Sequence, residues 1–143
     1  MEAVIFVGLP ASGKSTYFEN NLIKTHVRIN LDSLKTRERE NTLLTQCIES
    51  KKDFVIDNTN VTIDNRKKYI MLAKAAGYRV VCYYFDIPIE ECKKRNEQRD
   101  AKVPVVALYT IRKKMVVPTL NEGFEQIITI FPNGRGILSS FNS

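Results

Sequence analysis

The sequence predicts an α/β fold in three layers, in which a five-stranded parallel sheet lies between helices and a helical segment forms a lid. Two observations support this fold class. Short apolar runs rich in β-branched residues alternate along the chain with segments of helical periodicity. The apolar runs are continuous, which is typical of strands that are buried on both faces of a parallel sheet.

Five strands are expected. They are Ala3–Val7, Val27–Asn30, Phe54–Asp57, Val80–Phe85 and Gln126–Phe131. In an open parallel sheet, ligands bind outside the carboxyl ends of the strands. The candidate functional positions are therefore the residues that follow the strands: Gly8 onward, Asn30 to Asp32, Asp57 to Asn60, and Asp86.

Helical segments connect these strands. They are expected at Ser15–Ile23, Thr42–Ser50, Asp64–Ala76, Pro88 to about Arg99, and Val105–Val117. Gly77 suits the carboxyl end of the third helix, and Pro88 suits the first turn of the fourth. Residues 133–143 carry no clear pattern, so we expect one domain over residues 1–132 and a flexible C-terminal tail over 133–143.

The first strand leads directly into a phosphate-binding loop. Gly8-Leu9-Pro10-Ala11-Ser12-Gly13-Lys14-Ser15 has the form G-x-x-x-x-G-K-[ST], which predicts a P-loop NTPase domain of the nucleoside-kinase-like kind. The glycines let backbone N–H groups face the phosphates, Lys14 reaches the β- and γ-phosphates, and the Ser15 hydroxyl ligates Mg²⁺. ATP and Mg²⁺ are the expected cofactors, and the expected nucleotide contacts are Gly8, Pro10, Ala11, Ser12, Gly13, Lys14, Ser15 and Thr16.

Three absences favour phosphoryl transfer to a hydroxyl group over other uses of this loop. The chain has no Asn-Lys-x-Asp sequence for reading guanine. Asn58 follows Asp57, where an ATPase that activates water usually has glutamate. At 143 residues the chain is also too small for the additional modules of most motor ATPases. The expected enzyme is therefore an ATP-dependent kinase with an alcohol acceptor.

Asp32 is the candidate general base. The only histidine, His26, precedes the second strand and lies away from the loops, so the base must be a carboxylate. Asp32 follows that strand at the crevice, although aspartate is also common at helix N-termini for electrostatic reasons. Lys35 is expected one helical turn later on the same face as a contact for an acceptor phosphate; the alternative is a solvated lysine.

Asp57, Arg95 and Arg99 complete the candidate site. Asp57 ends a buried strand, where it can hold the water shell of Mg²⁺ and bond to Ser15; alternatively it only forms a turn. Arg95 and Arg99 are four residues apart on one helix and could close over ATP as a lid. The alternative for this pair is a solvated helix face in which Glu91 pairs with Arg95.

Composition indicates an ordinary globular protein. Hydrophobic residues make up 43%, charged residues 27%, and the formal net charge is +6, which favours an anionic partner. Cys47, Cys82 and Cys92 are expected to be free thiols, since their number and spacing fit neither a disulfide framework nor a zinc site. No secretory leader or membrane-spanning run is recognisable, so a soluble, intracellular, cytoplasmic protein is expected.

Several separated segments resemble one family, the 5′-polynucleotide kinases, and in particular the kinase domain of the eukaryotic polynucleotide kinase 3′-phosphatases. The resemblance covers nearly all of residues 3–131, and its most specific parts are the Asp-Asn-Thr-Asn and Pro-Thr-Leu-x-Glu-Gly-Phe stretches. The segments are Gly8 to Thr16, Ile29 to Asp32, Ile56 to Asn60, Arg66 with Tyr69, Ala75 to Gly77, Arg95-Asn96 with Arg99, Pro104-Val105, Tyr109, Arg112-Lys113 and Pro118 to Phe124.

The resemblance implies a role for each matching residue. Asp32 matches the general base toward the acceptor 5′-hydroxyl, and Arg99 and Arg95 match lid arginines on the ATP phosphates. Asp57 matches an aspartate near the magnesium site and the acceptor, and Arg66 matches an arginine that contacts phosphate or is structural. The implied partner is DNA or RNA with a 5′-hydroxyl end, and the implied context is nucleic acid repair.

Two departures and two alternatives stay open. Lys35 stands where phage-type members have an arginine, so the bidentate grip on an acceptor phosphate is lost. No phosphatase domain is attached, so a separate phosphatase or ligase partner would have to act on other end chemistries. The alternatives are a kinase of a small metabolite (nucleoside, sugar or antibiotic) and a nucleotide-binding module with little turnover. Basic side chains of Lys35, Arg66, Lys67 and Lys68 could line a nucleic-acid groove; the alternative is that they are solvated helix charges.

Overall fold

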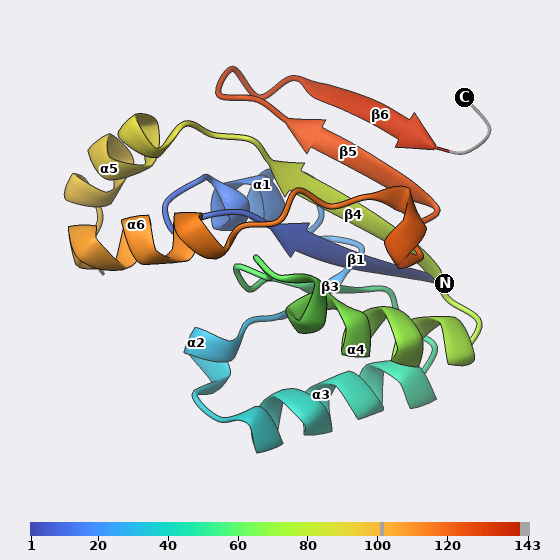
Figure 1. Ribbon diagram of the computed structural model, residues 1–143. Coiled ribbons are helices and arrows are strands. Elements are labelled where there is room, and N and C mark those ends of the chain that lie inside the picture. Colours follow the sequence, from blue (N-terminus) through green and yellow to red (C-terminus); the bar gives the residue numbers. More distant parts are fainter. Residues whose placement is uncertain (101, 141–143) are drawn as a thin grey trace.

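A six-stranded sheet forms the centre of the molecule. The computed structural model describes residues 1–100 and 102–140. The strand order is β2-β3-β1-β4-β5-β6 (Figure 1). The strands are β1 (Glu2–Val7), β2 (Val27–Ile29), β3 (Phe54–Ile56), β4 (Arg79–Phe85), β5 (Gln126–Ile130) and β6 (Gly136–Ser140). The first five are parallel to one another, so the predicted five-stranded parallel sheet is confirmed.

Helices cover both faces of this sheet. They are α1 (Lys14–Asn21), α2 (Leu31–Leu34), α3 (Arg37–Glu49), α4 (Ile63–Ala75), α5 (Ile89–Glu97) and α6 (Val105–Lys114), followed by a 3₁₀ turn η1 (Leu120–Glu122). The expected helices are present, but α3 begins at Arg37 rather than at Thr42. The side chain of Thr36 caps its first turn by accepting a hydrogen bond from the N–H of Arg39 at 3.2 Å.

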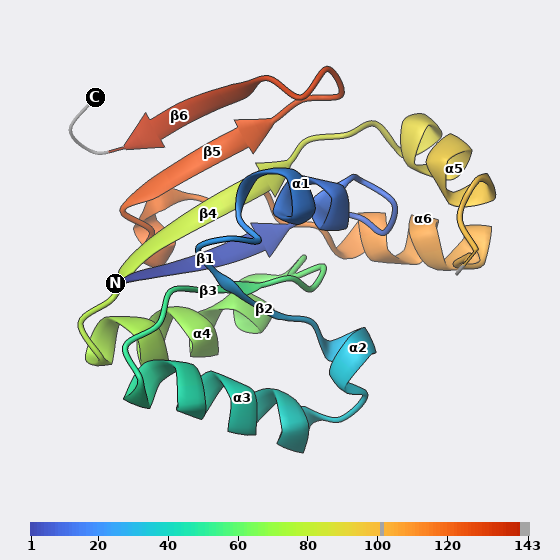
Figure 2. The same ribbon diagram turned by 180° about the vertical axis from the view of Figure 1, so that it is seen from behind.

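The two faces of the sheet bury separate cores, which confirms the three-layer arrangement. Alternate residues of β1 point to opposite sides, with Ile5 in one cluster and Phe6 in the other. The Ile5 side packs against Leu44 of α3 and Tyr69 of α4. The Phe6 side packs against Phe18 of α1 and includes residues of α5 and α6, so α1 lies across the sheet from α3 and α4 (Figures 1 and 2).

The C-terminal segment differs from the expected flexible tail. Residues 136–140 form β6, which pairs antiparallel with β5, while residues 141–143 lie outside the described residues. The two strands are joined by a turn in which Gly134 has a φ of 81°, and the N–H of Phe131 donates to the carbonyl of Arg135. The side chains of β6 are mostly exposed, which is why hydrophobic patterning did not indicate a strand there.

The carboxyl ends of the parallel strands point to one edge of the sheet. Strand β1 lies between β3 and β4. The connection that leaves β1 runs to β2 on one side and the connection that leaves β3 runs to β4 on the other, so the strand order reverses between β1 and β3. The helices α5 and α6 lie beyond this edge on one side and α2 lies beyond it on the other (Figure 1). No helix in residues 1–100 and 102–140 is both long and apolar enough to cross a membrane.

Candidate active site

The phosphate-binding loop is shaped by two residues with left-handed backbone. Ala11 has a φ of 62° and Gly13 a φ of 97°, so the loop curls between β1 and α1. A side chain at Gly8 would meet the Ser12 hydroxyl at 2.7 Å, so this close approach requires glycine. The Ser12 hydroxyl is the one buried side-chain polar atom without a hydrogen-bond partner in the part of the chain that the structure describes. A buried polar atom inside a phosphate-binding loop fits a polar ligand there.

The ammonium group of Lys14 lies over the loop. Its Nζ donates hydrogen bonds to the carbonyls of Gly8 (3.0 Å) and Leu9 (2.7 Å). Burial lowers the pKa of Lys14 to about 8, while the charges of Asp57 and Asp32 raise it and the charge of Arg99 lowers it further. These charges therefore converge on Lys14 from three other segments of the chain.

The segment after β3 holds the phosphate-binding loop in place. The N–H of Gly8 donates to the carbonyl of Thr59 at 3.0 Å, and the side-chain amide of Asn60 donates to the carbonyl of Phe6 at 2.8 Å. Asn60 is buried and has a φ of 47°. The sequence marked residues 57–60 by position and by family resemblance, but not this anchoring of the loop.

Asp32 lies in the short helix α2, and its position is fixed from outside that helix. Asn30 caps α2 by accepting from the N–H of Ser33 at 2.9 Å. The N–H of Leu31 donates to the side-chain oxygen of Asn58 at 2.9 Å. The carboxylate of Asp32 is exposed and has no hydrogen bond or ion pair with any described residue. The backbone around it is therefore held, and its carboxylate is free to accept a proton.

Lys35 does not share a helical face with Asp32, contrary to the prediction. Helix α2 ends at Leu34, and Lys35 follows with a φ of 75° while its N–H donates to the carbonyl of Leu31. A left-handed residue leaves the helical path, so its side chain leaves the face that carries Asp32. Lys35 is exposed, which agrees with the alternative of a solvated lysine.

Asp57 and Ser15 are joined through a residue that the sequence analysis missed. Arg28, on β2, donates from Nε to Oδ2 of Asp57 at 2.6 Å and from Nη2 to the Ser15 hydroxyl at 2.9 Å. The expected direct bond between Asp57 and Ser15 is thus replaced by a guanidinium bridge. The sequence did contain a signal for this role of Arg28. It is a basic residue in the penultimate position of a strand that leads into the crevice.

Both oxygens suit a divalent cation. A hydroxyl and a carboxylate are hard oxygen ligands of the kind that Mg²⁺ takes together with water and phosphate oxygens. Both contact the same guanidinium, so they are directed into a common space. Ser15 and Asp57 therefore fit the expected magnesium site, and the described residues contain no cluster of three or more histidine, cysteine or acidic side chains that would offer another.

A buried carboxylate, Glu40, organises the side of the site that carries Asp32. Its oxygens accept hydrogen bonds from the Tyr69 hydroxyl (2.8 Å), Asn58 (3.0 Å) and Arg37 (3.1 Å). Burial alone would raise the pKa of Glu40, but these bonds hold it below its ordinary value. Lys68 also lies 3.5 Å from Glu40, so its charge is partly used within the protein. This network was not foreseen, since its members lie far apart in the sequence.

The Arg66 guanidinium is engaged in contacts within the protein. It is fully buried, and it donates to both carboxylate oxygens of Glu122, at 2.7 and 3.0 Å. Its Nη1 donates to the carbonyls of Asn60 and Val116 at 3.0 Å each. Of the two roles that the resemblance implied, the structural one agrees with this geometry, and the substrate contact stays a prediction.

The two candidate lid arginines behave differently. Arg95 donates to the carbonyl of Ser12 at 3.2 Å and pairs with Glu91 at 3.2 Å, so it connects α5 to the phosphate-binding loop. The backbone N–H of Arg99 donates to the Asn96 carbonyl at 3.2 Å, but its exposed side chain has no hydrogen bond or ion pair with the described residues. Its charge lowers the pKa of Lys14, in the same direction as the larger effect of burial. Arg99 is therefore a free cation beside the loop, whereas Arg95 already bonds to it.

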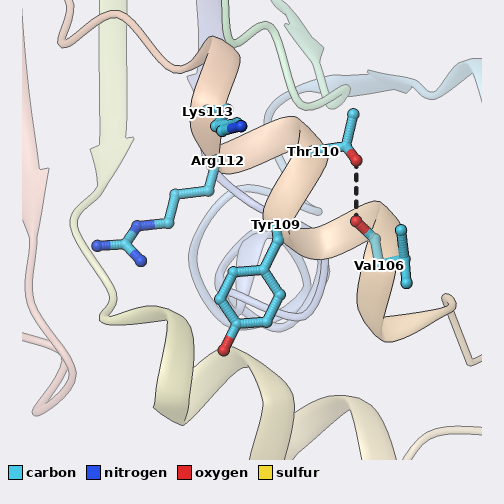
Figure 3. A pocket seen from close by; sticks show the side chains of 5 residues that line it. All are labelled: Val106, Tyr109, Thr110, Arg112 and Lys113. Atoms are coloured by element: carbon cyan, nitrogen blue, oxygen red, sulfur yellow. Dashed lines mark hydrogen bonds between the residues drawn. The ribbon is translucent and has the colours of Figure 1, made fainter.

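Helix α6 carries a hollow of about 500 Å³ that the sequence did not predict. Figure 3 shows Tyr109 and Arg112 projecting toward the same side of this helix. The hydroxyl of Tyr109 lies 3.4 Å from Nζ of Lys93, which also lies over the tyrosine ring. The residues that line the hollow are Val106, Tyr109, Thr110, Arg112 and Lys113. It thus combines one aromatic ring with two cations.

Two of the remaining predictions concern packing and are confirmed. Nε2 of His26 pairs with Glu2 at 2.9 Å near the amino ends of the strands, away from the loops. The three cysteines are free and buried.

Comparison with known proteins identifies relatives over most of the chain. Residues 4–118 match the family of AAA domains. A bifunctional polynucleotide phosphatase/kinase of Schizosaccharomyces pombe is 31% identical over 132 residues, which are 88% of this chain and 32% of the relative. A protein of Acanthamoeba polyphaga mimivirus, provisionally assigned the same two activities, is 32% identical over 138 residues, 90% of this chain and 33% of that protein. These relatives confirm the resemblance to polynucleotide kinases, and the chain spans about a third of their length.

A solved structure with the same fold has a nucleotide analogue bound. The crystal structure of Chaetomium thermophilum Kti12 in complex with ADP-AlF3 matches with a TM-score of 0.69 at 16% identity, over 92% of this chain and 89% of that one. The P-loop fold predicted from the sequence is therefore confirmed.

Proposed function

The chain belongs to the AAA domain family, and on this basis we propose that it is an ATP-dependent kinase that phosphorylates the 5′-hydroxyl end of DNA or RNA. The polynucleotide kinases among its relatives support this choice of acceptor. The phosphate-binding loop, with the unpaired hydroxyl of Ser12 and the ammonium of Lys14, supports ATP as the donor.

One observation carries the proposal: an unpaired carboxylate lies within electrostatic range of the Lys14 ammonium of the phosphate-binding loop. Asp32 has no partner among the described residues, and it lies close enough to Lys14 for its charge to raise the pKa of the ammonium against the larger effect of burial. A carboxylate in that position is available to accept a proton from an incoming hydroxyl. A module that only bound nucleotide would not need it.

The reaction follows from this arrangement. The acceptor hydroxyl transfers its proton to the Asp32 carboxylate while its oxygen forms a bond to the γ-phosphorus, and the bond from that phosphorus to the β,γ-bridging oxygen breaks to give ADP. Lys14 and Arg99 supply positive charge for the γ-phosphate oxygens. Ser15 and Asp57 would hold Mg²⁺, which when bound neutralises charge on the β- and γ-phosphates.

The surface beyond the loop favours a polynucleotide over a small metabolite. The hollow on α6 offers Tyr109 for base stacking and Arg112 and Lys113 for backbone phosphates, the two kinds of contact that bind single strands. Lys35 and Lys67 are exposed as well, although Lys68 and Arg66 are engaged within the protein. A metabolite kinase on this scaffold remains the second candidate, since the fold accommodates either.

The test is a transfer assay with γ-labelled ATP and Mg²⁺. The acceptors are 5′-hydroxyl oligonucleotides of DNA and RNA, and in parallel a panel of nucleosides and sugars. We expect label on oligonucleotide ends, with transfer that weakens as salt is raised. Asp32→Asn should reduce the transfer rate by about 10³-fold, within the range of a lost general base, while ATP affinity stays within about twofold.

Asp64→Asn is the matched control, because Asp64 is an exposed aspartate in the first turn of α4. It should transfer phosphate at the normal rate. Label found only on a small molecule would favour the metabolite kinase, and unimpaired transfer by Asp32→Asn would remove the proposed base. Tight ATP binding with no transfer to any acceptor would favour a nucleotide-binding module.

A further inference from the structure

Arg28 occupies the position between the two oxygens that fit a magnesium site. Its Nε–Oδ2 distance to Asp57 is 2.6 Å and its Nη2–Oγ distance to Ser15 is 2.9 Å. One planar guanidinium therefore bridges the carboxyl end of β3 and the first turn of α1. Nothing in the phosphate-binding motif requires an arginine at this point of β2.

The bridge satisfies an electrostatic need of the protein without nucleotide. The side chain of Asp57 is 2% exposed, and a buried carboxylate is stable only with a charged or hydrogen-bonded partner. Among the described residues, Arg28 forms the only ion pair with Asp57. The Arg28 side chain is 32% exposed, so it can move toward solvent more easily than the Asp57 carboxylate can.

A magnesium ion and this guanidinium exclude each other. Both are cations, and a magnesium ion held by the Asp57 carboxylate and the Ser15 hydroxyl would compete with Arg28 for the same two oxygens. Without phosphates, a divalent cation would have to displace Arg28, and it would be repelled by the positive charges of Lys14 and Arg99. Only one buried carboxylate, that of Asp57, would attract it. When a triphosphate is bound, its negative charge offsets the repulsion between the metal ion and these protein cations.

We propose that Arg28 is a specificity-determining residue of the metal site: it keeps the site closed to free divalent cations and is displaced only when Mg²⁺ arrives with a nucleoside triphosphate. The inference rests on the nucleotide side of the proposed function and does not depend on which hydroxyl compound accepts the phosphate. Its consequence is an ordered preference, in which free metal binds weakly and metal with nucleotide binds well.

The experiment measures metal binding rather than turnover. Mn²⁺ serves as the spectroscopic probe, and electron paramagnetic resonance gives its dissociation constant with the protein alone and with a non-hydrolysable ATP analogue. We expect Arg28→Gln to bind Mn²⁺ without nucleotide about tenfold more tightly than the wild type does. With the analogue, this difference should shrink to less than about threefold, because Arg28 has already left the site in the wild type.

A second variant guards against loss of folding. Arg28→Lys keeps a positive charge for Asp57, but a single nitrogen cannot bridge both oxygens as a guanidinium does. It should show an intermediate gain in affinity for free Mn²⁺ with a normal melting temperature. Arg79→Gln is the matched control, because Arg79 is an exposed arginine at the start of β4, at the opposite edge of the sheet, and it should behave as the wild type does.

The outcomes separate this inference from the proposed function. If both Arg28 variants bind free Mn²⁺ no more tightly than the wild type while the analogue binds normally, the role of Arg28 is overturned and the kinase proposal stands. If the wild type binds neither the analogue nor Mn²⁺ with the analogue, both proposals fail. If oligonucleotides are not phosphorylated but the Mn²⁺ results are as expected, only the acceptor assignment fails.

Discussion

The phosphate-binding loop and the segment that carries Asp32 face each other at the carboxyl edge of the sheet, but they are held in different ways. The loop is built by its own backbone, with left-handed residues at Ala11 and Gly13 and a hydrogen bond from Ser12 N–H to the Leu9 carbonyl at 3.2 Å. Helix α2 has only four residues and depends on side chains from other elements, Asn58 and the buried Glu40 behind it.

This difference shows how the two halves of a transfer site acquire precision. The loop takes its outside contacts from the segment after β3 and from Arg95 of α5, so its geometry should tolerate changes around α3 and α4. A short helix positioned by remote side chains transmits any change in those side chains to its own carboxylate. We therefore expect substitutions around α3 and α4 to affect transfer without affecting nucleotide affinity.

The largest effect is expected from Lys14→Met on the loop side. Loss of the ammonium should reduce transfer by about 10³-fold, as for other groups that stabilise transition-state charge, and should weaken ATP binding in parallel. The melting temperature should not fall, because the variant removes a cation whose burial is unfavourable. Lys24→Met, at an exposed lysine shortly after α1, should match the wild type in both assays. Equal ATP affinity in the Lys14 variant would contradict the assigned role.

A smaller effect, confined to transfer, is expected from Glu40→Gln on the Asp32 side. Glutamine cannot accept from Tyr69, Asn58 and Arg37 together, so α2 should shift and kcat should fall by about 10- to 100-fold. The KM for ATP should stay within about twofold in steady-state assays. Glu38→Gln, an exposed residue of the same helix, is the control. Parallel losses in kcat and in ATP affinity would show that the two regions are not independent.

The same network should make stability sensitive to acid. The pKa of Glu40 is lower in the folded protein than its ordinary value, because its hydrogen bonds outweigh the effect of burial. The stabilisation is therefore fully present above a pH of about 4.5 and is lost as the pH falls through the lowered pKa. Urea denaturation at a series of pH values should show this loss in the wild type and less of it in Glu40→Gln.

The smallest expected effect is the uptake of protons by Lys14 when a triphosphate binds to the loop. The pKa of Lys14 is about 8, so at pH 8 half of the molecules carry a neutral amine. Triphosphate binding should restore the full charge with uptake of about half a proton. Calorimetry in two buffers of different ionisation enthalpy measures this uptake. It should approach zero at pH 6.5 and be absent in Lys14→Met; uptake unchanged in that variant would assign the proton to another group.

The direction of the pKa shift of Lys14 also determines how stability depends on pH in the alkaline range. Because the folded pKa of Lys14 lies below the ordinary lysine value of 10.5, the unfolded chain binds more protons between pH 8 and 10.5. The Lys14 contribution to stability of the nucleotide-free protein therefore increases with pH across that window.

The sheet was predictable because parallel strands are continuous apolar runs in the sequence. The helices that pack on the sheet were predictable because their apolar residues recur at helical spacing. The boundaries were less predictable where structure depends on polar residues. Helix α3 begins in the charged stretch after Thr36, and its cap was the available signal. Strand β6 has few buried residues, but Asn133-Gly134 before it is a hairpin signal that could have indicated it.

The site was predictable where its residues are contiguous. The loop from Gly8 to Thr16 was read directly from its spacing. Arg28 and Glu40 were missed, because their roles arise only when β2, β3 and α4 come together. Lys35 was misplaced because nothing in its sequence context indicated left-handed backbone. The bidentate pair of Arg66 with Glu122 was not foreseen, because the two residues lie far apart in the sequence.

Four consecutive residues after β3 connect the two halves of the site, the first two contacting one half and the last two the other. Asp57 and Asn58 contact Arg28 and Leu31, whereas Thr59 and Asn60 contact Gly8 and Phe6. The spacing between the phosphate donor and the carboxylate is thus encoded in a stretch of fixed length. Protein engineers who wish to admit bulkier acceptors should leave this tetrapeptide intact and vary the length of the connection between α2 and α3, where added residues leave the nucleotide cradle undisturbed.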